Sequence, residues 1–394
     1  MPAMPIFRRV MSAYPSWLND LTLGQNNNLL FAADFVHDRT RLFLNKRQVG
    51  EESLAIDTDA KWLQRGGLWV QSLANSLPNS DDGLIIEESR TTLAQKSRRL
   101  DDASYWTATN INTSAVAGID GITGSATRLS STGGTPRTIF GSVNTAAAAN
   151  CTLAPFVRYV SGAGDLEWTL DGGSTWTAYT GLTSAYQRKE ATVNVANPQV
   201  GFRITSGNSD FDIDFANGET GAFATSPIES STSQVTRAAD IVYLDFSGGV
   251  LNDALTLAGQ IEPFGGLNNQ PGISLSKDGD AQNRIHVVGI STTTVQQRTF
   301  VSNATQGDLS TAIGAVSEYR FATRSKANDR AFYAAEIGSS ALSSTSSSGD
   351  HSDGLNRLRM SYPTGVGGAQ VISRLVLWTK AYGDDFLERW CEAT

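Results

Sequence analysis

The sequence has few of the residues on which metal sites and disulfide frameworks depend. In 394 residues there are 2 cysteines and 3 histidines, and these stand far apart from one another. A structural zinc site needs three or four such ligands held close together, and a disulfide framework needs more cysteines at short spacings. We therefore expect neither structural zinc nor disulfides.

Charge and long apolar runs are also scarce. Charged residues make up 18% of the chain, the net charge is -8, and no long Lys/Arg run occurs. Nucleic-acid binding needs clustered cations that neutralise phosphates, so nucleic acid is not an expected partner. No apolar run approaches the roughly 20 residues that span a bilayer, and polar residues follow Arg8 and Arg9 where a signal peptide would have its apolar core. We expect no membrane span and no secretion.

The common catalytic signatures are missing as well. The sequence has no Gly-x-Gly-x-x-Gly after a strand, no Gly-x-x-x-x-Gly-Lys and no Gly-x-Ser-x-Gly, which removes the usual marks of nucleotide enzymes and α/β-hydrolases. We predict that the protein is not an enzyme and takes no cofactor. Glycoside hydrolysis needs only two carboxyl groups, which sequence spacing rarely identifies, so a polysaccharide-degrading enzyme is kept as an alternative.

What the chain does contain is typical of a turn-rich β protein. It has 37 glycines, and from residue 83 almost to the end short stretches of β-forming residues alternate with turn residues. This rhythm predicts a mainly β protein with two β-sandwich (jelly-roll) domains behind a smaller irregular N-terminal segment. The Ser/Thr-rich stretch 225–235 is the best candidate for a linker between domains. We therefore predict domains at 1–82, 83–235 and 236–394.

One hairpin supplies the candidate glycan-binding residues. Residues 169–176 fit the Asp-box pattern of sialidase-like propellers, in which the Asp accepts hydrogen bonds within the turn and the Trp packs beneath it. Aromatic faces also suit sugar rings, and we place the candidate glycan-binding surface at Asp171, Trp176 and Tyr179. Trp106 and Trp168 are expected in the core.

A row of carboxylates is the candidate metal site. Residues 210–215 alternate strictly, which puts Asp210, Asp212 and Asp214 on one strand face and three apolar residues on the core face. Such a row is either solvated surface or a set of oxygen ligands for a structural Ca²⁺.

Several stretches together resemble bacteriophage and prophage virion proteins of the tail-fibre, spike and head-fibre type. In these proteins a carbohydrate-binding-like jelly roll is combined with a concanavalin-like or laminin-G-like sandwich. The stretches that resemble the jelly roll and its connector are residues 83–93, 102–107, 221–228 and 235–240; those that resemble the sandwich are residues 355–360, 371–378 and 384–387. The resemblance covers roughly residues 29–394. Residues 384–391 are expected to form a short closing helix.

The resemblance implies a virion structural protein, made in the host bacterial cytoplasm and carried on the virion surface. The leading interpretation is a tail-fibre, tail-tip or spike component that adheres to host cell-surface polysaccharide. The alternative is a capsid-bound head decoration or head-fibre protein, since the same modules serve both. Residues 1–82 are expected to contact other virion proteins, and a homo-oligomer is expected because appendages repeat around symmetry axes.

Overall fold

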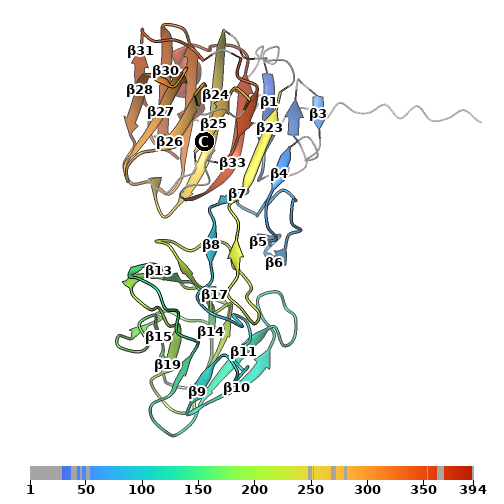
Figure 1. Cartoon of the computed structure of the whole chain (residues 1–394), viewed down its shortest axis with the longest axis vertical. Helices are drawn as coiled ribbons and strands as arrows, with labels where there is room; N and C mark the ends of the chain where they lie inside the picture. Colours follow the sequence, from blue (N-terminus) through green and yellow to red (C-terminus); the bar gives the residue numbers. More distant parts are fainter. Residues whose placement is uncertain are drawn as a thin grey trace, which may run out of the picture.

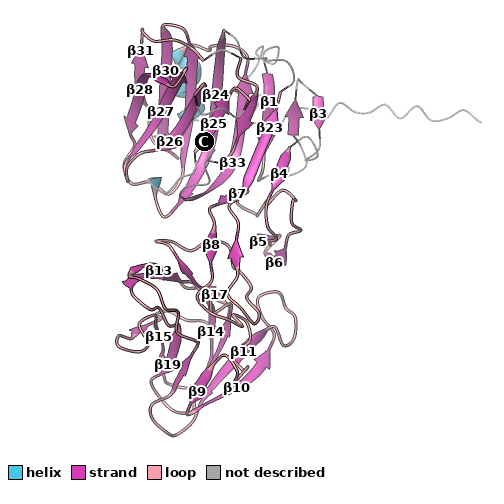
Figure 2. Ribbon diagram, in the orientation of Figure 1, coloured by secondary structure: helices cyan, strands magenta, loops and turns pink. Residues whose placement is uncertain are grey.

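A computed structural model of the chain describes residues 29–36, 42–44, 47–49, 54–246, 251, 253–267, 272–278, 282–352, 354–361 and 368–392. The molecule consists of two β modules stacked along its long axis (Figure 1). Strands dominate the described part of both modules, and a short helix lies on the module that contains the chain's C-terminal part (Figure 2). The predicted mainly β fold is confirmed. Within the described residues no helix is long and apolar enough to cross a membrane.

The first module, here called the sandwich module, consists of two antiparallel sheets. The strands of the nine-stranded sheet are, in spatial order, β3 (Arg47–Val49), β2 (Leu42–Leu44), β1 (Leu29–Asp34), β33 (Ala369–Trp378), β24 (Ala254–Phe264), β29 (Tyr319–Lys326), β30 (Asp329–Glu336) and β31 (Leu342–Ser346), with β7 (Leu84–Glu87) also paired to β33. The strands of the seven-stranded sheet are β28 (Ala304–Ala312), β27 (Thr294–Val301), β26 (Arg284–Gly289), β25 (Ile273–Ser276), β32 (Arg357–Arg359), β23 (Ile241–Asp245) and β4 (Ala55–Asp57).

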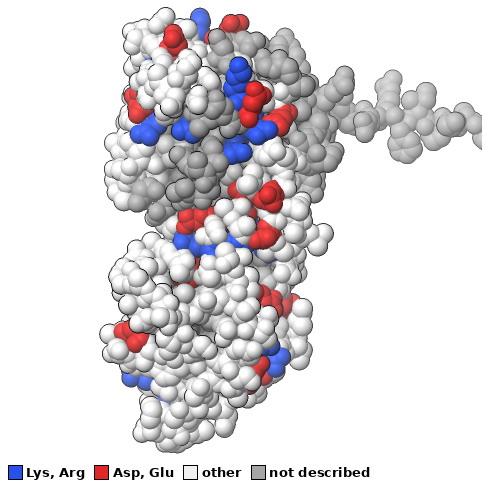
Figure 3. Space-filling model, in the orientation of Figure 1, with Lys and Arg blue, Asp and Glu red and all other residues white. Residues whose placement is uncertain are grey.

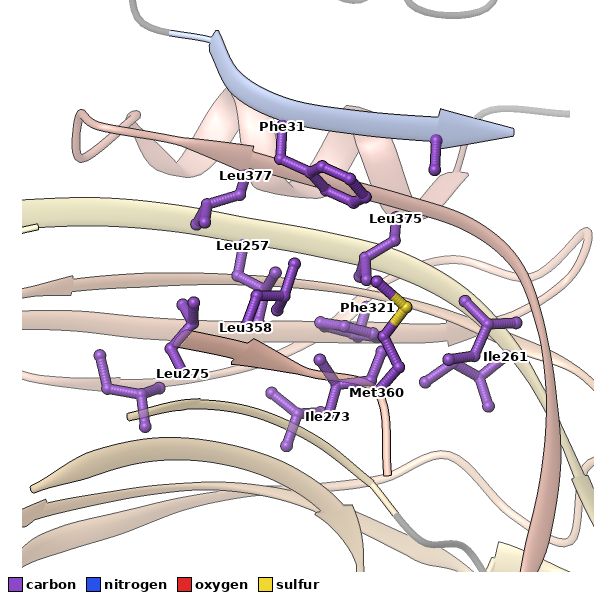
Figure 4. Close-up of a cluster of buried hydrophobic side chains, with 14 of the residues drawn as sticks. Phe31, Leu257, Ile261, Ile273, Leu275, Phe321, Leu358, Met360, Leu375 and Leu377 are labelled. Carbon is purple, nitrogen blue, oxygen red and sulfur yellow. The ribbon is translucent and has the colours of Figure 1, made fainter. Parts of the chain in front are cut away.

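The main core of the sandwich module lies between these two sheets. Leu257 and Phe321 of the nine-stranded sheet belong to one buried cluster with Leu275 and Leu358 of the seven-stranded sheet (Figure 4). Alternate residues of each strand point to this layer, which explains the period-two apolar pattern of the sequence.

Helix α2 (Asp384–Glu392) covers the other face of the nine-stranded sheet. Trp378 of β33 meets Phe386 and Trp390 of the helix edge-on, with ring centroids 5.2 and 6.1 Å apart. Asp384 and Asp385 stand in its first turn, where carboxylates are stabilised by the helix dipole. The helix that the sequence predicts at 384–391 is therefore present.

The second module, here called the inserted module, spans residues 88–237 and is also a sandwich of antiparallel sheets. One five-stranded sheet contains β10 (Ile111–Val116), β11 (Ala126–Ser131), β20 (Asp210–Asp214), β14 (Phe156–Ser161) and β17 (Gln187–Arg188). The other contains β16 (Thr177–Ala178), β15 (Leu166–Thr169), β19 (Gly201–Ile204), β12 (Thr138–Phe140) and β9 (Thr107–Thr109), and a three-stranded sheet contains β18 (Ala191–Val195), β13 (Ala149–Leu153) and β21 (Gly218–Thr220). Trp106 and Trp168 lie in the core between the sheets, as predicted.

Strand pairing divides the chain differently from the predicted boundaries. β1 pairs with β33, and β4 pairs with β23, so residues 29–57 belong to the sandwich module instead of forming a separate segment. β7 also pairs with β33, which places the start of the predicted middle domain in the sandwich module. Residues 1–28 of the segment expected to contact other virion proteins lie outside the described residues.

The chain leaves the sandwich module after β7 and returns before β23. The outgoing strand β8 (Arg90–Thr91) and the returning strand β22 (Thr236–Arg237) pair with each other, and Figure 1 shows them side by side between the modules. The hairpin of β5 (Trp62–Arg65) and β6 (Leu68–Gln71) lies beside this crossing. The narrow part of the molecule is therefore built from three separate stretches of sequence.

Candidate functional site

The structure places Asp171 in a tight hairpin between β15 and β16. Its Oδ1 accepts hydrogen bonds from Thr169 Oγ1 at 2.7 Å and from the Thr175 backbone N–H at 2.9 Å, and its Oδ2 accepts one from Thr175 Oγ1 at 2.6 Å. Gly172 and Gly173 have φ of 70° and 89°, which the turn requires and which glycine adopts without strain. Burial alone would raise the pKa of Asp171, but the hydrogen bonds from Thr175 and Thr169 lower it. The carboxylate is thus occupied by the turn, as the Asp-box pattern predicts.

Other side chains cover the rings of Trp176 and Tyr179, the two aromatic residues of the predicted glycan-binding surface. Trp176 is half-buried, with its ring 5.7 Å from that of Phe140 and the Arg203 guanidinium 4.7 Å above it. Tyr179 is only 8% exposed, and its ring lies 6.4 Å from that of Trp168 in the core. The prediction for Tyr179 therefore needs correction, because a buried ring offers no face to a sugar.

The surroundings of the β20 carboxylates match neither of the two expectations, which were a solvated surface row and a set of Ca²⁺ ligands. Asp212 lies between two arginines of the neighbouring strands: Arg128 Nε donates to Oδ1 at 2.7 Å, and Arg158 Nε donates to Oδ2 at 2.8 Å. Asp214 is held in the same way by Arg98, and Asp210 accepts a hydrogen bond from Ser161. Asp212 and Asp214 are fully buried.

These pairings give the carboxylates a structural explanation that the strand pattern alone did not contain. The counter-charges of Asp212 come from the adjacent strands β11 and β14, and that of Asp214 comes from Arg98 in the turn before β9. A counter-charge is the usual condition for burying a carboxylate. Among the described residues no group of three or more His, Cys, Asp or Glu side chains is arranged to hold a metal ion.

A pocket of about 320 Å³ lies where the two modules meet, and we call it the junction pocket. Its lining residues belong to the stretches 62–69, 80–87, 188–190, 222–226 and 264–265. Both modules and the β5–β6 hairpin therefore contribute to it. Ligand pockets of small molecules commonly have volumes of about 300–1,000 Å³ and are frequent at such module interfaces.

Two tryptophans of the β5–β6 hairpin line the junction pocket. The Trp62 ring meets Phe215 edge-on at 5.4 Å, and the Trp69 ring meets Phe156 edge-on at 4.8 Å, so the inserted module fixes both indoles. Trp62 is mostly buried and Trp69 is half-buried. The Nε1–H group of Trp62 is buried and has no hydrogen-bond partner among the described residues.

The polar part of the pocket contains both donors and acceptors. Arg188 donates to the Thr225 carbonyl oxygen through Nη2, whereas its buried Nε has no partner among the described residues. Burial lowers the pKa of this guanidinium. Glu190 accepts a hydrogen bond from the Ala224 backbone N–H at 2.8 Å, and the exposed side chains of Gln64 and Asp82 complete the rim.

Figure 3 shows acidic and basic side chains together at the narrow part between the two modules. The carboxylates that line the pocket are Asp82, Glu87 and Glu190, and its lining cation is Arg188. Aromatic faces together with convergent donors and acceptors suit a ring that has an apolar C–H face and hydroxyl groups at its edge. The acidic excess disfavours a ligand that is itself an anion.

The sequence pattern does not predict this pocket, although two of its lining segments are conspicuous in the sequence. The stretches around Trp62 and Trp69 stand out in the sequence as two aromatic-centred segments. Their partners Arg188, Phe223 and Phe264 are more than a hundred residues away, and only the pairing of the two modules brings them together.

Comparison with known proteins gives little further information. No protein-family model matches the chain, and no curated protein matches it. Among solved structures, a mutant of a GH54 α-L-arabinofuranosidase soaked with 4-nitrophenyl α-L-arabinofuranoside shares 11% identity, with 78% of this chain and 61% of that chain covered and a TM-score of 0.30. The chain thus spans less than two thirds of that protein.

The N-terminal CBM22 tandem domain of Xyn10C from Paenibacillus barcinonensis shares 10% identity, with 74% of this chain and 98% of that chain covered and a TM-score of 0.25. At these identities and scores, neither likeness indicates a function.

Proposed function

We propose that the protein is a non-catalytic glycan-binding component of a bacteriophage particle surface, and that it binds host-cell polysaccharide in the junction pocket. The observation that carries the glycan-binding part is the half-buried Trp69 indole beside the exposed polar side chains of Gln64, Asp82 and Glu190 in a preformed cavity. A sugar ring stacks on the Trp69 indole, and its hydroxyl groups bond to Gln64, Asp82 or Glu190.

The virion part of the proposal rests on a resemblance to tail-fibre, spike and head-fibre proteins. The stretches that carry it are residues 83–93, 102–107, 221–228, 235–240, 355–360, 371–378 and 384–387. Within that class we propose a tail appendage, present as a homo-oligomer on the virion surface and attached through residues N-terminal to the inserted module. Several copies compensate for a weak single site, because linked sites raise the effective concentration. Binding of this kind takes no cofactor.

The non-catalytic part is supported by what the carboxylates near the pocket do. Glu87 is held by hydrogen bonds from the backbone N–H and the side chain of Ser226, and Glu190 accepts the Ala224 N–H. Two of the three carboxylates that line the pocket thus have structural partners, whereas glycoside hydrolysis needs a pair of carboxyl groups at the reacting bond.

The test uses the full-length chain with host cells and with their extracted polysaccharide, and it records retained protein and new reducing ends separately. We expect retention without cleavage. Trp69→Ala should weaken binding at least about tenfold, the loss typical of an aromatic anchor. Trp176→Ala is the matched control, since Trp176 is a half-buried tryptophan of the inserted module outside the pocket.

Four outcomes would count against parts of the proposal. If Trp69→Ala and Trp176→Ala bound the polysaccharide equally well, and both had the melting temperature of the wild type, the junction pocket would not be the binding site. New reducing ends would overturn the non-catalytic assignment. Antibody labelling of intact particles on the head would exclude the tail position, and unlabelled particles would exclude the virion position.

A further inference from the structure

Three charged side chains from distant parts of the sequence meet in the interior between the modules. Lys61 precedes β5, Glu87 ends β7, and Asp240 precedes β23; all three side chains have 0% exposure. Lys61 Nζ contacts Asp240 Oδ2 directly and also donates to Glu87 Oε2 at 2.9 Å. The Glu87 backbone N–H donates to the same Asp240 Oδ2 at 2.7 Å.

An amine held against a carboxyl group, with a second carboxylate on the amine, has the composition of an amide-forming site. Proximity and a water-excluded setting favour a condensation that does not proceed between free side chains in water. We propose that Lys61 and Asp240 form an intramolecular isopeptide bond and that Glu87 is the catalytic residue that transfers the protons.

The reaction balances without any other reagent. Glu87 accepts a proton from the Lys61 ammonium group, and the free amine attacks Cγ of the protonated Asp240 carboxyl group. The Nζ–Cγ bond forms, the bond from Cγ to one carboxyl oxygen breaks, and Glu87 returns a proton to the leaving hydroxyl. The new amide nitrogen must lose one further proton, which Glu87 takes and passes to solvent, from which Asp240 had taken up its own proton. The products are therefore one secondary amide and one water molecule, and Glu87 is regenerated as a carboxylate.

The surroundings of the two carboxyl groups suit these different roles. Burial, and next in effect the neighbouring charge of Glu87, raise the pKa of Asp240 against the attraction of Lys61, which favours the protonated form that an amine attacks. Burial would also raise the pKa of Glu87, but Arg237 and Lys61 together with Ser226 lower it well below its usual range. Glu87 therefore stays ionised beside Lys61 Nζ, 2.9 Å away, and Asp240 is the carboxyl group that becomes protonated.

The hydrogen bonds of Asp240 identify the oxygen that leaves. Oδ2 accepts the Glu87 N–H and can keep this bond as the amide oxygen. Oδ1 is buried without a hydrogen-bond partner among the described residues, so its departure as water leaves no hydrogen bond broken. After the reaction two buried charges are gone, and Glu87 remains paired with Arg237, whose Nη2 lies 3.2 Å from Oε2. Removing buried charges in this way is favourable.

The position of the bond suggests what it does for the molecule. Lys61 and Asp240 are 179 residues apart and flank the whole inserted module. A covalent link between them encloses the inserted module in one loop and joins the start of the β5–β6 hairpin to the point at which the chain re-enters the sandwich module. Such a bond remains when the β8–β22 pair is pulled apart.

The test is the intact mass of the purified, folded, full-length protein after incubation at neutral pH. We expect a mass lower than that of the sequence by one water molecule, and a proteolytic peptide in which Lys61 and Asp240 are joined. Lys61→Met, Asp240→Ala and Glu87→Gln should each give the full mass of their own sequence. Lys96→Met, which alters a partly exposed lysine near Asp102, should still lose the water.

Two results would overturn the proposal. One is the full sequence mass for folded wild-type protein. The other is loss of water located by peptide sequencing at an Asp-Gly step such as Asp171-Gly172, where succinimide formation gives the same mass change. The wild-type mass and the joined peptide decide the matter even if a variant fails to fold, and neither depends on glycan binding.

Discussion

Arg98 and Asp214 form a doubly hydrogen-bonded ion pair on the side of the inserted module next to the β5–β6 hairpin. Arg98 Nε lies 2.8 Å from Oδ1, and Nη2 lies 2.9 Å from Oδ2. The same guanidinium lies 4.9 Å from the centre of the Trp62 ring and 4.4 Å from that of Phe215. Because Trp62 belongs to the hairpin, one arginine neutralises a buried carboxylate and also holds the hairpin against the inserted module.

Arg98→Ala should therefore destabilise the inserted module strongly. Asp214 has a fully buried side chain and would lose its main counter-charge, a change that typically costs about 3–5 kcal/mol. We expect a loss of this size in urea unfolding followed by tryptophan fluorescence. The control is Arg99→Ala, since Arg99 pairs with Asp101 on the surface and should contribute less than about 1 kcal/mol. Equal losses in the two variants would contradict the assignment.

The β class was predictable because strands leave a local mark in the sequence. The alternation over residues 210–215 places Phe211 and Ile213 in the core, and the helix at 384–391 also forms nearly where the pattern puts it. Such patterns report only which face of an element is apolar. They do not report the strand beside it, so the pairing of β1 with β33 across more than three hundred residues left no signal.

The candidate site was less predictable for the same reason. A carboxylate row looks alike in sequence whether water, a cation or an arginine faces it, and the arginines on Asp212 are 84 and 54 residues away. The Asp171 turn was predictable because all its hydrogen bonds lie within a few residues. The junction pocket was not, since its walls come from two modules and a hairpin.

The hairpin at Asp171 should loosen in acid. The pKa of Asp171 in the fold is below its ordinary value of 3.8, so the ionised carboxylate stabilises the turn at pH values above that value. This contribution is lost as the pH falls through the lower pKa of the folded protein. We expect exchange of the Thr175 amide hydrogen, corrected for the intrinsic pH effect, to accelerate there.

Asp171→Asn is the matched variant for this measurement. It keeps one acceptor oxygen but has no charge to titrate, so its corrected exchange rate should be independent of pH over the same interval. A wild-type rate that is equally flat would show that the carboxylate does not hold the turn.

Tyr179→Phe should leave both stability and glycan binding nearly unchanged. The Tyr179 hydroxyl is buried without a hydrogen-bond partner among the described residues, and burial raises its pKa well above the usual value. Removing an unsatisfied hydroxyl costs no hydrogen bond, so we expect a change below about 1 kcal/mol, in either direction. Tyr179→Ala should be much more harmful, because it removes the ring that packs on Trp168. A binding defect in a stable Tyr179→Phe protein would return this residue to the site.

The two cysteines should report the unfolding of the two modules separately. Cys151 lies in the core of the inserted module and Cys391 in helix α2 of the sandwich module, and both are buried and free. Burial raises the pKa of each thiol, and only the thiolate reacts with a disulfide reagent. We therefore expect no labelling of native protein at mildly alkaline pH and labelling of both thiols in concentrated guanidinium chloride.

At intermediate denaturant the two thiols should react at different rates, because each is released by the opening of its own module. Cys151→Ser and Cys391→Ser assign the two phases. Arg98→Ala should accelerate only the Cys151 phase, since Asp214 belongs to the inserted module. If Arg98→Ala accelerated both phases equally, the two modules would unfold as one cooperative unit, and the independence assumed for their cores would be wrong.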